Sequence, residues 1–241
     1  MLDRGIWITW YDLSEQNRDA YFDWLHQTYI PRVLERPGCM WAAHYETIVK
    51  GDVRMHTEDS TVPQGTRFLL LFGAEYADVF GKPAPTRFHA QLSAEDRQML
   101  AMRTGERVNI MAEAGRVEGL AHADYTDGMA LAPCIQLGSY NCPWQNEEEM
   151  LTWYTEVRMP AIAEPPPVGI RIRKLSSVMG WAKHSILYEF TSIEGRHEYF
   201  KAHQSRPDMK PWLEWVGRNL THAPGSSSLG RRIWPPLADG R

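Results

Sequence analysis

Two histidines and two tyrosines have positions that suit acid–base chemistry. His26 lies on an amphipathic segment three residues before Tyr29, and His44 lies in a strand-like run. Because imidazole titrates near neutral pH, histidines beside tyrosines form an acid–base set, with a limb of the pH profile expected near neutrality. Tyr11 and Tyr140 end two short apolar runs and could donate to a developing oxyanion. The sequence predicts these four residues as catalytic; the competing interpretation is that each is purely structural.

Three arginines suit the binding of an anion. A strand-like stretch alternates isoleucine with arginine, which puts Arg171 and Arg173 on one face. Arg158 lies on a preceding helical segment, and guanidinium groups bind carboxylates through two parallel hydrogen bonds. We predict that these three arginines, with Tyr29, bind a substrate carboxylate. The alternative is a solvated strand face, or ion pairs with an acid on a neighbouring strand such as Glu189.

An internal repeat determines where these residues lie. With an offset of 129 residues, positions 6–37 align without a gap to 135–166 and give eight identities, against about two expected by chance. The identical pairs are Ile6/Ile135, Tyr11/Tyr140, Gln16/Gln145, Asn17/Asn146, Trp24/Trp153, Pro31/Pro160, Glu35/Glu164 and Pro37/Pro166. We therefore expect a first repeat over 1–121, a linker over 122–133 and a second repeat over 134–241.

Each half shows the element order strand–helix–strand–strand–helix–strand. The expected strands cover 6–11, 39–49, 67–72 and 106–119 in the first half, and 134–141, 168–178, 184–191 and 227–234 in the second. In the first half, one expected helix ends near residue 35 and a second covers 93–103. In the second half, the expected helices cover 146–164, 193–203 and 211–220. Such a βαββαβ unit is a four-stranded antiparallel sheet with helices on one face, so two units can bury their bare faces against each other. The predicted fold class is α+β, with two tandem ferredoxin-like repeats packed into a barrel.

This pattern resembles the dimeric α+β barrel superfamily and, within it, the EthD-like proteins. Their first helix carries an aromatic residue, then His-x-Pro, then Pro-Gly before the second strand. This chain shows the frame as Trp24, Tyr29, Ile30, Pro31, Pro37 and Gly38, and less closely as Trp153, Arg158, Met159, Pro160, Pro166 and Pro167. The family's histidine is Tyr29 in one half and Arg158 in the other, so chemistry carried by that histidine in relatives is absent here. Pro31 is expected where the helix bends over the sheet.

Composition excludes several classes of function. The net charge of −4 and the isoelectric point near 6.1 give no basic field for nucleic acid. The apolar run 68–72 is too short to span a bilayer, and the start lacks the layout of a signal peptide. The three cysteines contain no C-x-x-C pair, which favours a reducing cytoplasm and excludes a disulfide framework or a cysteine zinc site. No histidine spacing suits a metal, and the peroxidase motif G-x-x-D-G is absent, so neither metal nor haem is expected.

The function predicted on these grounds is that of a cofactor-independent enzyme acting on a small molecule. Superfamily relatives isomerise, cyclise, cleave or oxygenate aromatic-derived or lactone substrates, and the arginines favour an anionic ring-derived acid handled by proton transfer. An isomerase, tautomerase or lyase is therefore predicted. The alternatives are a cofactor-free monooxygenase of phenolic substrates and a non-catalytic ligand-binding or stress-response barrel. A homodimer is also expected, because trailing segments such as 231–236 could bury apolar edges on a partner.

Overall fold

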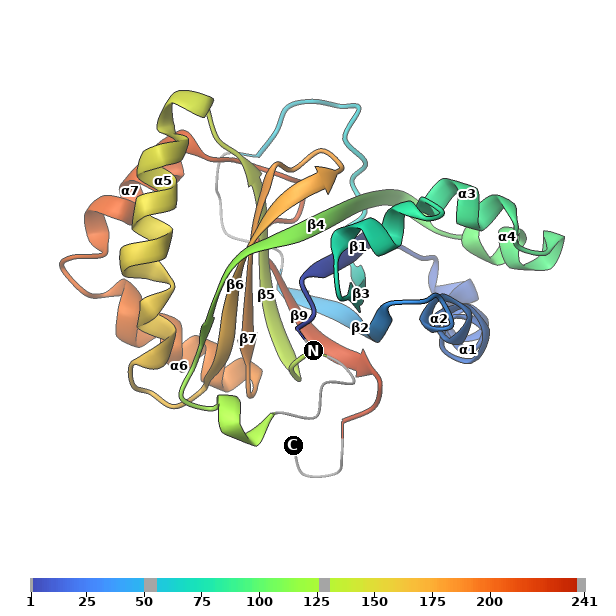
Figure 1. The fold of residues 1–241 in the computed structure, drawn as a ribbon, viewed down its shortest axis with the longest axis horizontal. Coiled ribbons are helices and arrows are strands. Elements are labelled where there is room, and N and C mark those ends of the chain that lie inside the picture. Colours follow the sequence, from blue (N-terminus) through green and yellow to red (C-terminus); the bar gives the residue numbers. More distant parts are fainter. Residues whose placement is uncertain (1, 50–55, 126–130, 238–241) are drawn as a thin grey trace.

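An antiparallel sheet closed into a barrel forms the centre of the protein (Figure 1). The computed structural model describes residues 2–49, 56–125 and 131–237. Eight of the described strands follow each other in the order β7-β6-β4-β1-β3-β2-β9-β5, and β5 pairs with β7 again to close the ring. Their bounds are β1 (Gly5–Asp12), β2 (Cys39–Val49), β3 (Phe68–Ala74), β4 (Thr104–Glu118), β5 (Cys134–Asn141), β6 (Gly169–Met179), β7 (His184–Phe190) and β9 (Ser228–Trp234). The short β8 (Thr221–His222) adds to β5 outside this ring.

Helices cover the outer face of the barrel in two groups on opposite sides (Figure 1). The first-half helices are α1 (Arg18–Trp24), α2 (Ile30–Leu34), α3 (Pro85–Ala90) and α4 (Ala94–Leu100). The second-half helices are α5 (Glu147–Trp153), α6 (Ile193–Gln204) and α7 (Lys210–Asn219). Because one face of each strand meets helices and the other meets the barrel interior, β1 reads as a nearly continuous apolar run, buried from Gly5 to Tyr11. The predicted α+β class is confirmed; helix α3 is an element that the sequence pattern did not indicate.

A π-helical turn precedes the proline in the first helix of each half. These turns are η2 (Leu25–Tyr29) and η6 (Tyr154–Arg158), and they lie 129 residues apart, as β1 and β5 do. Proline has no N–H and its ring crowds the preceding turn, so the chain widens there. The residue before each proline donates its N–H five residues back, from Ile30 to Leu25 and from Met159 to Tyr154. The repeated sequence therefore encodes a repeated irregularity of the backbone.

The two halves share one interior. Their sheets do not only face each other, as the sequence suggested; they also join at both edges, where β2 pairs with β9 and β4 pairs with β6. The apolar side chains inside come from both halves and include Ile8, Trp10, Leu71, Leu137 and Leu187. Residues 126–130 of the predicted linker lie outside the described residues, and the proposed domain boundaries stay a prediction.

A buried ionic cluster ties the start of the chain to the second half. The guanidinium of Arg173, 1% exposed, binds the carboxylate of Asp3 at 2.9 Å and lies 3.3 Å from that of Glu189. Arg116 also binds Asp3, at 2.8 Å. Burial alone would raise the pKa of Asp3, but Arg173, Arg116 and a hydrogen bond from Trp41 lower it to about 2. Each charge in the cluster therefore depends on its partners.

We expect Arg173→Met to lower the free energy of unfolding by about 3–5 kcal/mol, because it removes the most deeply buried cation of the cluster and leaves Asp3 and Glu189 with one arginine each, Arg116 and Arg171. Urea denaturation of the purified protein measures this. The matched control is Arg18→Met, since Arg18 forms an exposed pair with Glu15 and should change stability by less than about 1 kcal/mol. Equal effects of the two substitutions would contradict the structural importance of the cluster.

Candidate functional site

A chain of three hydrogen-bonded side chains runs between the first-half helices and the sheet. The hydroxyl of Tyr11 lies 2.7 Å from Nε2 of His44, and Nδ1 of His44 lies 2.9 Å from Nε2 of His26. Tyr11 and His44 are fully buried, and His26 is half-buried. The structure thus brings together three of the four residues predicted as catalytic, and we refer to them as the relay.

Strand order and the π-helical turn position the relay. Tyr11 on β1 is paired with Phe68 on β3, and His44 on β2 is paired with Leu70 two residues further along β3. Because residues two apart on a strand share a face, Tyr11 and His44 both point toward the helices with Phe68 between them. The second residue of the π-helical turn is His26, which faces them from the helix layer. Wide helical turns of this kind are frequent at functional sites.

Burial keeps both imidazoles neutral at pH 7. The pKa of His26 is lowered to about 4, mainly because burial disfavours the charged ring. The pKa of His44 is also held well below its usual range, first by burial and then by the charges of His26 and Arg103. A neutral imidazole has one donor and one acceptor nitrogen, so the relay has two orientations, one with hydrogen bonds running from Tyr11 to His26 and one reversed. The two orientations contain the same number of protons and differ in which nitrogen of each imidazole carries the hydrogen.

Arg103 organises a tyrosine cluster at the buried end of the relay. Its side chain is fully buried, it donates from Nε to the Tyr21 hydroxyl at 2.5 Å, and its carbon Cζ lies 4.9 Å from the ring centroid of Tyr11 and 5.3 Å from that of Tyr29. The ring of Tyr11 also lies 5.8 Å from that of Tyr21, measured between centroids. Glu106 balances the guanidinium charge at 2.6 Å. Tyr29, predicted to bind substrate, is therefore part of this cluster.

Sequence reasoning missed Arg103 and His89. The hydroxyl of Tyr29 lies 2.7 Å from Nε2 of His89 on α3, the helix that the sequence pattern did not indicate. Arg103 ends the predicted helix 93–103, where a terminal arginine usually meets solvent or the helix dipole. No local signal showed that strand β4, which begins next to it, returns beside β1.

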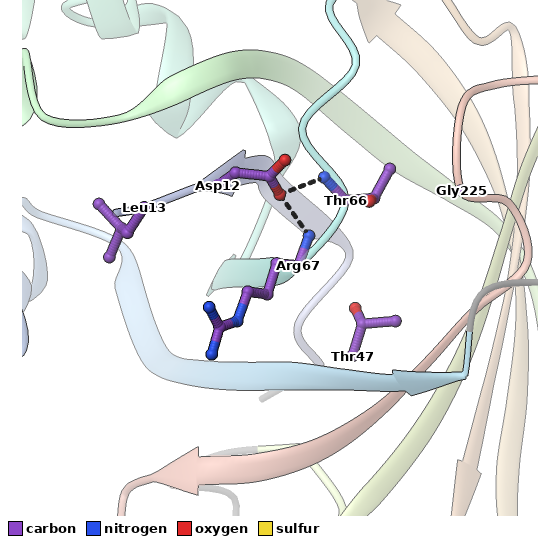
Figure 2. Close-up of a pocket in the computed structure, with 6 residues that line it drawn as sticks. All are labelled: Asp12, Leu13, Thr47, Thr66, Arg67 and Gly225. Carbon is purple, nitrogen blue, oxygen red and sulfur yellow. Dashed lines mark hydrogen bonds between the residues drawn. The ribbon is translucent and has the colours of Figure 1, made fainter. Parts of the chain in front are cut away.

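Figure 2 shows a pocket lined by residues from the end of β1, from β2 and from the segments that lead into β3 and β9. Its volume is about 270 Å³, and it is lined by Asp12, Leu13, Thr47, Thr66, Arg67 and Gly225. The Asp12 carboxylate accepts the backbone N–H groups of Thr66 and Arg67 at 2.8 and 2.7 Å. Within the described part of the chain, the buried hydroxyl of Thr47 has no partner. Such a lining suits a small molecule with hydroxyl groups.

One aromatic ring separates this pocket from the relay. The guanidinium of Arg67 lies 5.0 Å from the ring centroid of Phe68, and that ring packs against Tyr11 and His44 at 5.6 and 5.7 Å. Ion pairs with Glu15 and Glu46 hold the Arg67 side chain. A ligand in the pocket would therefore lie next to the relay without touching its imidazoles.

The predicted convergence of three arginines is wrong. Arg158 donates to the hydroxyl of Tyr188 at 2.7 Å, whereas Arg171 and Arg173 each lie 3.3 Å from the carboxylate of Glu189. Tyr188 and Glu189 are neighbours on β7 and point to opposite faces of the sheet. Arg158 thus lies under the second-half helices, while the other two lie on the interior face. The alternation predicted for β6 and the alternative of ion pairs with Glu189 are both confirmed.

Tyr140 lies apart from the relay. It is fully buried in the second half, where its ring stacks on that of Tyr154 at 6.2 Å and lies 6.0 Å from that of His184. Strand pairing puts Lys174, opposite Ile186, at the place that His44 occupies opposite Leu70 in the first half. The second half therefore does not repeat the two-histidine relay.

Comparison with known proteins gives structural relatives only. The sequence matches no family model and no curated protein. An anthrone oxidase-like protein superposes with a TM-score of 0.63 and 11% identity, over 96% of this chain and 91% of that one. A proposed monooxygenase from Lactobacillus acidophilus NCFM gives 0.54 and 10%, over 96% and 94%. Chlorite dismutase from Candidatus Nitrospira defluvii, in complex with imidazole, gives 0.53 and 9%, over 95% and 90%.

These likenesses establish the fold. They agree with the resemblance to dimeric α+β barrels, while the EthD-like assignment stays a prediction. Among the described residues, no three His, Cys, Asp or Glu side chains are grouped so that they could hold a metal ion. No helix of that part of the chain is long and apolar enough to cross a membrane. The predicted homodimer and cytoplasmic location stay predictions.

We expect the rings of His26 and His44 to stay neutral from pH 8 down to pH 5. Nitrogen-15 NMR of the imidazoles measures this directly, and the same histidines in urea-unfolded protein should titrate near pH 6.5. Because the unfolded chain then binds protons that the folded chain does not, the free energy of unfolding should fall as the pH drops from 7 to 5. Protonation of either folded ring above pH 6 would contradict the assignment.

Proposed function

We propose that the protein is an enzyme that moves a proton on a small aromatic or enolisable substrate, with His26 as the group that meets the substrate. The observation that carries the proposal is the continuous hydrogen-bonded relay from a buried phenol to a half-buried imidazole. His26 is its accessible end, and Nδ1 of that ring has no partner among the described residues. Phe22 and Trp234 flank the ring at 5.6 and 5.7 Å, which suits a flat apolar substrate.

The orientation in which Nε2 of His26 donates to Nδ1 of His44 leaves Nδ1 of His26 as a free base. Nδ1 takes a proton from the substrate, and the imidazolium that forms keeps its Nε2–H hydrogen bond to His44. Tyr11 holds His44 by a second hydrogen bond and keeps its own proton. The Nδ1–H of His26 then returns the proton to another atom of the substrate. Removal and return of one proton at different atoms is an isomerisation or tautomerisation.

The low pKa of His26 restricts the substrate. A base with a pKa of about 4 is weak, so it can remove a proton only from a group whose conjugate base is stabilised by resonance. Phenols, β-keto acids and anthrone-type methylene groups have such conjugate bases, and unactivated C–H groups do not. The limb expected near neutrality from the sequence therefore moves to acidic pH: activity should be constant from pH 8 to about 5 and fall toward pH 4 as His26 is protonated.

A second candidate function is oxygenation without a cofactor. The names of two structural relatives, an anthrone oxidase-like protein and a proposed monooxygenase, favour it. Removal of a proton from an anthrone-type CH₂ group gives a carbanion that can react with O₂; the overall change of CH₂ and O₂ to C=O and H₂O balances without another reductant. Both candidates begin with the same proton removal, so the relay serves either one.

We expect anthrone incubated anaerobically with the protein in D₂O to exchange its methylene hydrogens for deuterium, as followed by mass spectrometry. His26→Gln and His44→Gln should lower kcat for exchange by about 10²–10⁴-fold with little change in KM, because they remove the base or its partner rather than a binding contact. Tyr11→Phe should lower it less, since Tyr11 acts through His44. The matched control, His197→Gln, changes an exposed histidine of α6 and should leave exchange unchanged.

Admission of O₂ separates the two candidate functions. Consumption of O₂ with formation of anthraquinone at a rate that falls in the His26 variant supports oxygenation, and exchange without consumption supports isomerisation. Binding of anthrone and of a panel of phenols and β-keto acids, with no exchange faster than in buffer for any of them, would overturn the proposal and leave a ligand-binding barrel.

A further inference from the structure

Arg158 carries a buried charge that the protein itself does not balance. Its side chain is 4% exposed, and within the described residues its guanidinium makes one hydrogen bond, from Nε to the neutral hydroxyl of Tyr188. Its Nη1 is buried without a partner, and no carboxylate of the described residues forms an ion pair with it. A buried cation without a counter-ion lowers stability unless something else supplies the negative charge.

The other buried arginines are better satisfied. Arg103 binds Glu106, and Arg173 binds Asp3. Arg36 and Arg107 each donate to two backbone carbonyl groups. The comparison shows that this chain normally gives a buried guanidinium either a carboxylate or a pair of carbonyl oxygens. Each of these arginines also keeps at least one buried nitrogen without a partner among the described residues, but each makes at least two hydrogen bonds or ion pairs, whereas Arg158 makes one. This smaller number of contacts points to a partner from outside the chain.

The surroundings of Arg158 describe that partner. The hydroxyl of Tyr199, a fully buried residue, also has no hydrogen-bond partner, and its ring lies 6.4 Å from that of Tyr188. Two unsatisfied donors, a guanidinium N–H and a phenol O–H, are what the two oxygens of one carboxylate need. The guanidinium lies 5.3 Å from the ring centroid of Tyr188 and 5.1 Å from that of Phe200, so aromatic rings enclose the charge.

We propose that the second half of the barrel binds the carboxylate of a small aromatic acid at Arg158 and Tyr199, between helix α6 and the sheet. This site is separate from the relay, which lies under the first-half helices, and it does not depend on the proposed proton transfer. The repeat supports the division. Tyr29 is the last residue of the π-helical turn in the first half, and Arg158 is the last residue of that turn in the second half. The same position of the repeat therefore holds a phenol beside the relay in one half and a cation in this site in the other.

Binding of benzoate to the purified full-length chain tests the proposal. Isothermal titration calorimetry should detect benzoate, weaker or no binding of acetate, which lacks the ring, and no binding of benzyl alcohol, which lacks the charge. Inorganic phosphate should not compete with benzoate. Benzoate should also raise the melting temperature of the protein, since a ligand that binds only the folded state stabilises it. Failure of benzoate to bind, or equal binding of benzyl alcohol, would overturn the proposal.

Substitutions locate the site. Arg158→Met should abolish benzoate binding and leave the melting temperature without ligand equal to or above that of the wild type, because it removes an unbalanced buried charge. Arg158→Lys and Tyr199→Phe should weaken binding by about tenfold to a hundredfold, since each loses one charge-assisted contact or more. The control Arg218→Met, at an exposed position of α7, should bind benzoate as the wild type does. If Arg158→Met strongly lowers stability while benzoate still binds to Arg158→Lys unchanged, the arginine is structural and the proposal fails.

Because these readouts measure binding, their outcome is distinguishable from that of the exchange assay. Loss of proton exchange in the histidine variants leaves benzoate binding untouched, and loss of benzoate binding in Arg158→Met leaves exchange on anthrone untouched. A single variant that removed both activities would contradict the separation of the two sites.

Discussion

Closure of the sheet is the constraint on which the other features of this protein depend. Once β2 pairs with β9 and β4 pairs with β6, no strand edge within the ring is open, and each strand has one face in the shared interior and one under helices. Polar side chains on either face then lose water. Burial lowers the pKa of His26 and His44 and makes the interior arginines and acids depend on each other. The chemistry of the protein follows from where a closed barrel removes water.

The two faces of the sheet separate two kinds of polar organisation. On the interior face, two arginines, Arg171 and Arg173, neutralise two carboxylates, those of Asp3 and Glu189, and leave little charge for a ligand. On the outer face, groups such as His44 and Arg158 meet mainly aromatic rings and neutral donors or acceptors. Substrate-directed chemistry is therefore expected between the helices and the sheet, where polar groups keep hydrogen-bonding capacity, and the interior acts as a structural core.

Much of the fold could be predicted from the sequence, because the repeat and the strand alternation are local patterns. The offset of 129 residues aligns the sequence of β1 with that of β5 and the sequence of one π-helical turn with that of the other. The alternation around Arg171 correctly predicts that Arg171 and Arg173 share one face of β6. The site was only partly predictable. His26 and His44 could be named, but their contact depends on which strands become neighbours, and Arg103 joins Tyr11 only because β4 pairs with β1. The predicted convergence of Arg158 with Arg171 was wrong for a similar reason: the linear sequence does not show that Arg158, in the π-helical turn, meets the outer face of the sheet, whereas Arg171 on β6 lies on the interior face.

The repeated π-helical turn has a consequence for how such a chain can diversify. In both halves the last residue of the turn lies two residues before the proline. At that position the wide helix presents one side chain, Tyr29 or Arg158, to the sheet. The surrounding backbone is the same in kind, so this position can change its chemistry without a change of scaffold. A duplicated barrel of this type therefore offers two equivalent positions, and the residue at one of them can change to bind a new ligand while the other half retains its former role.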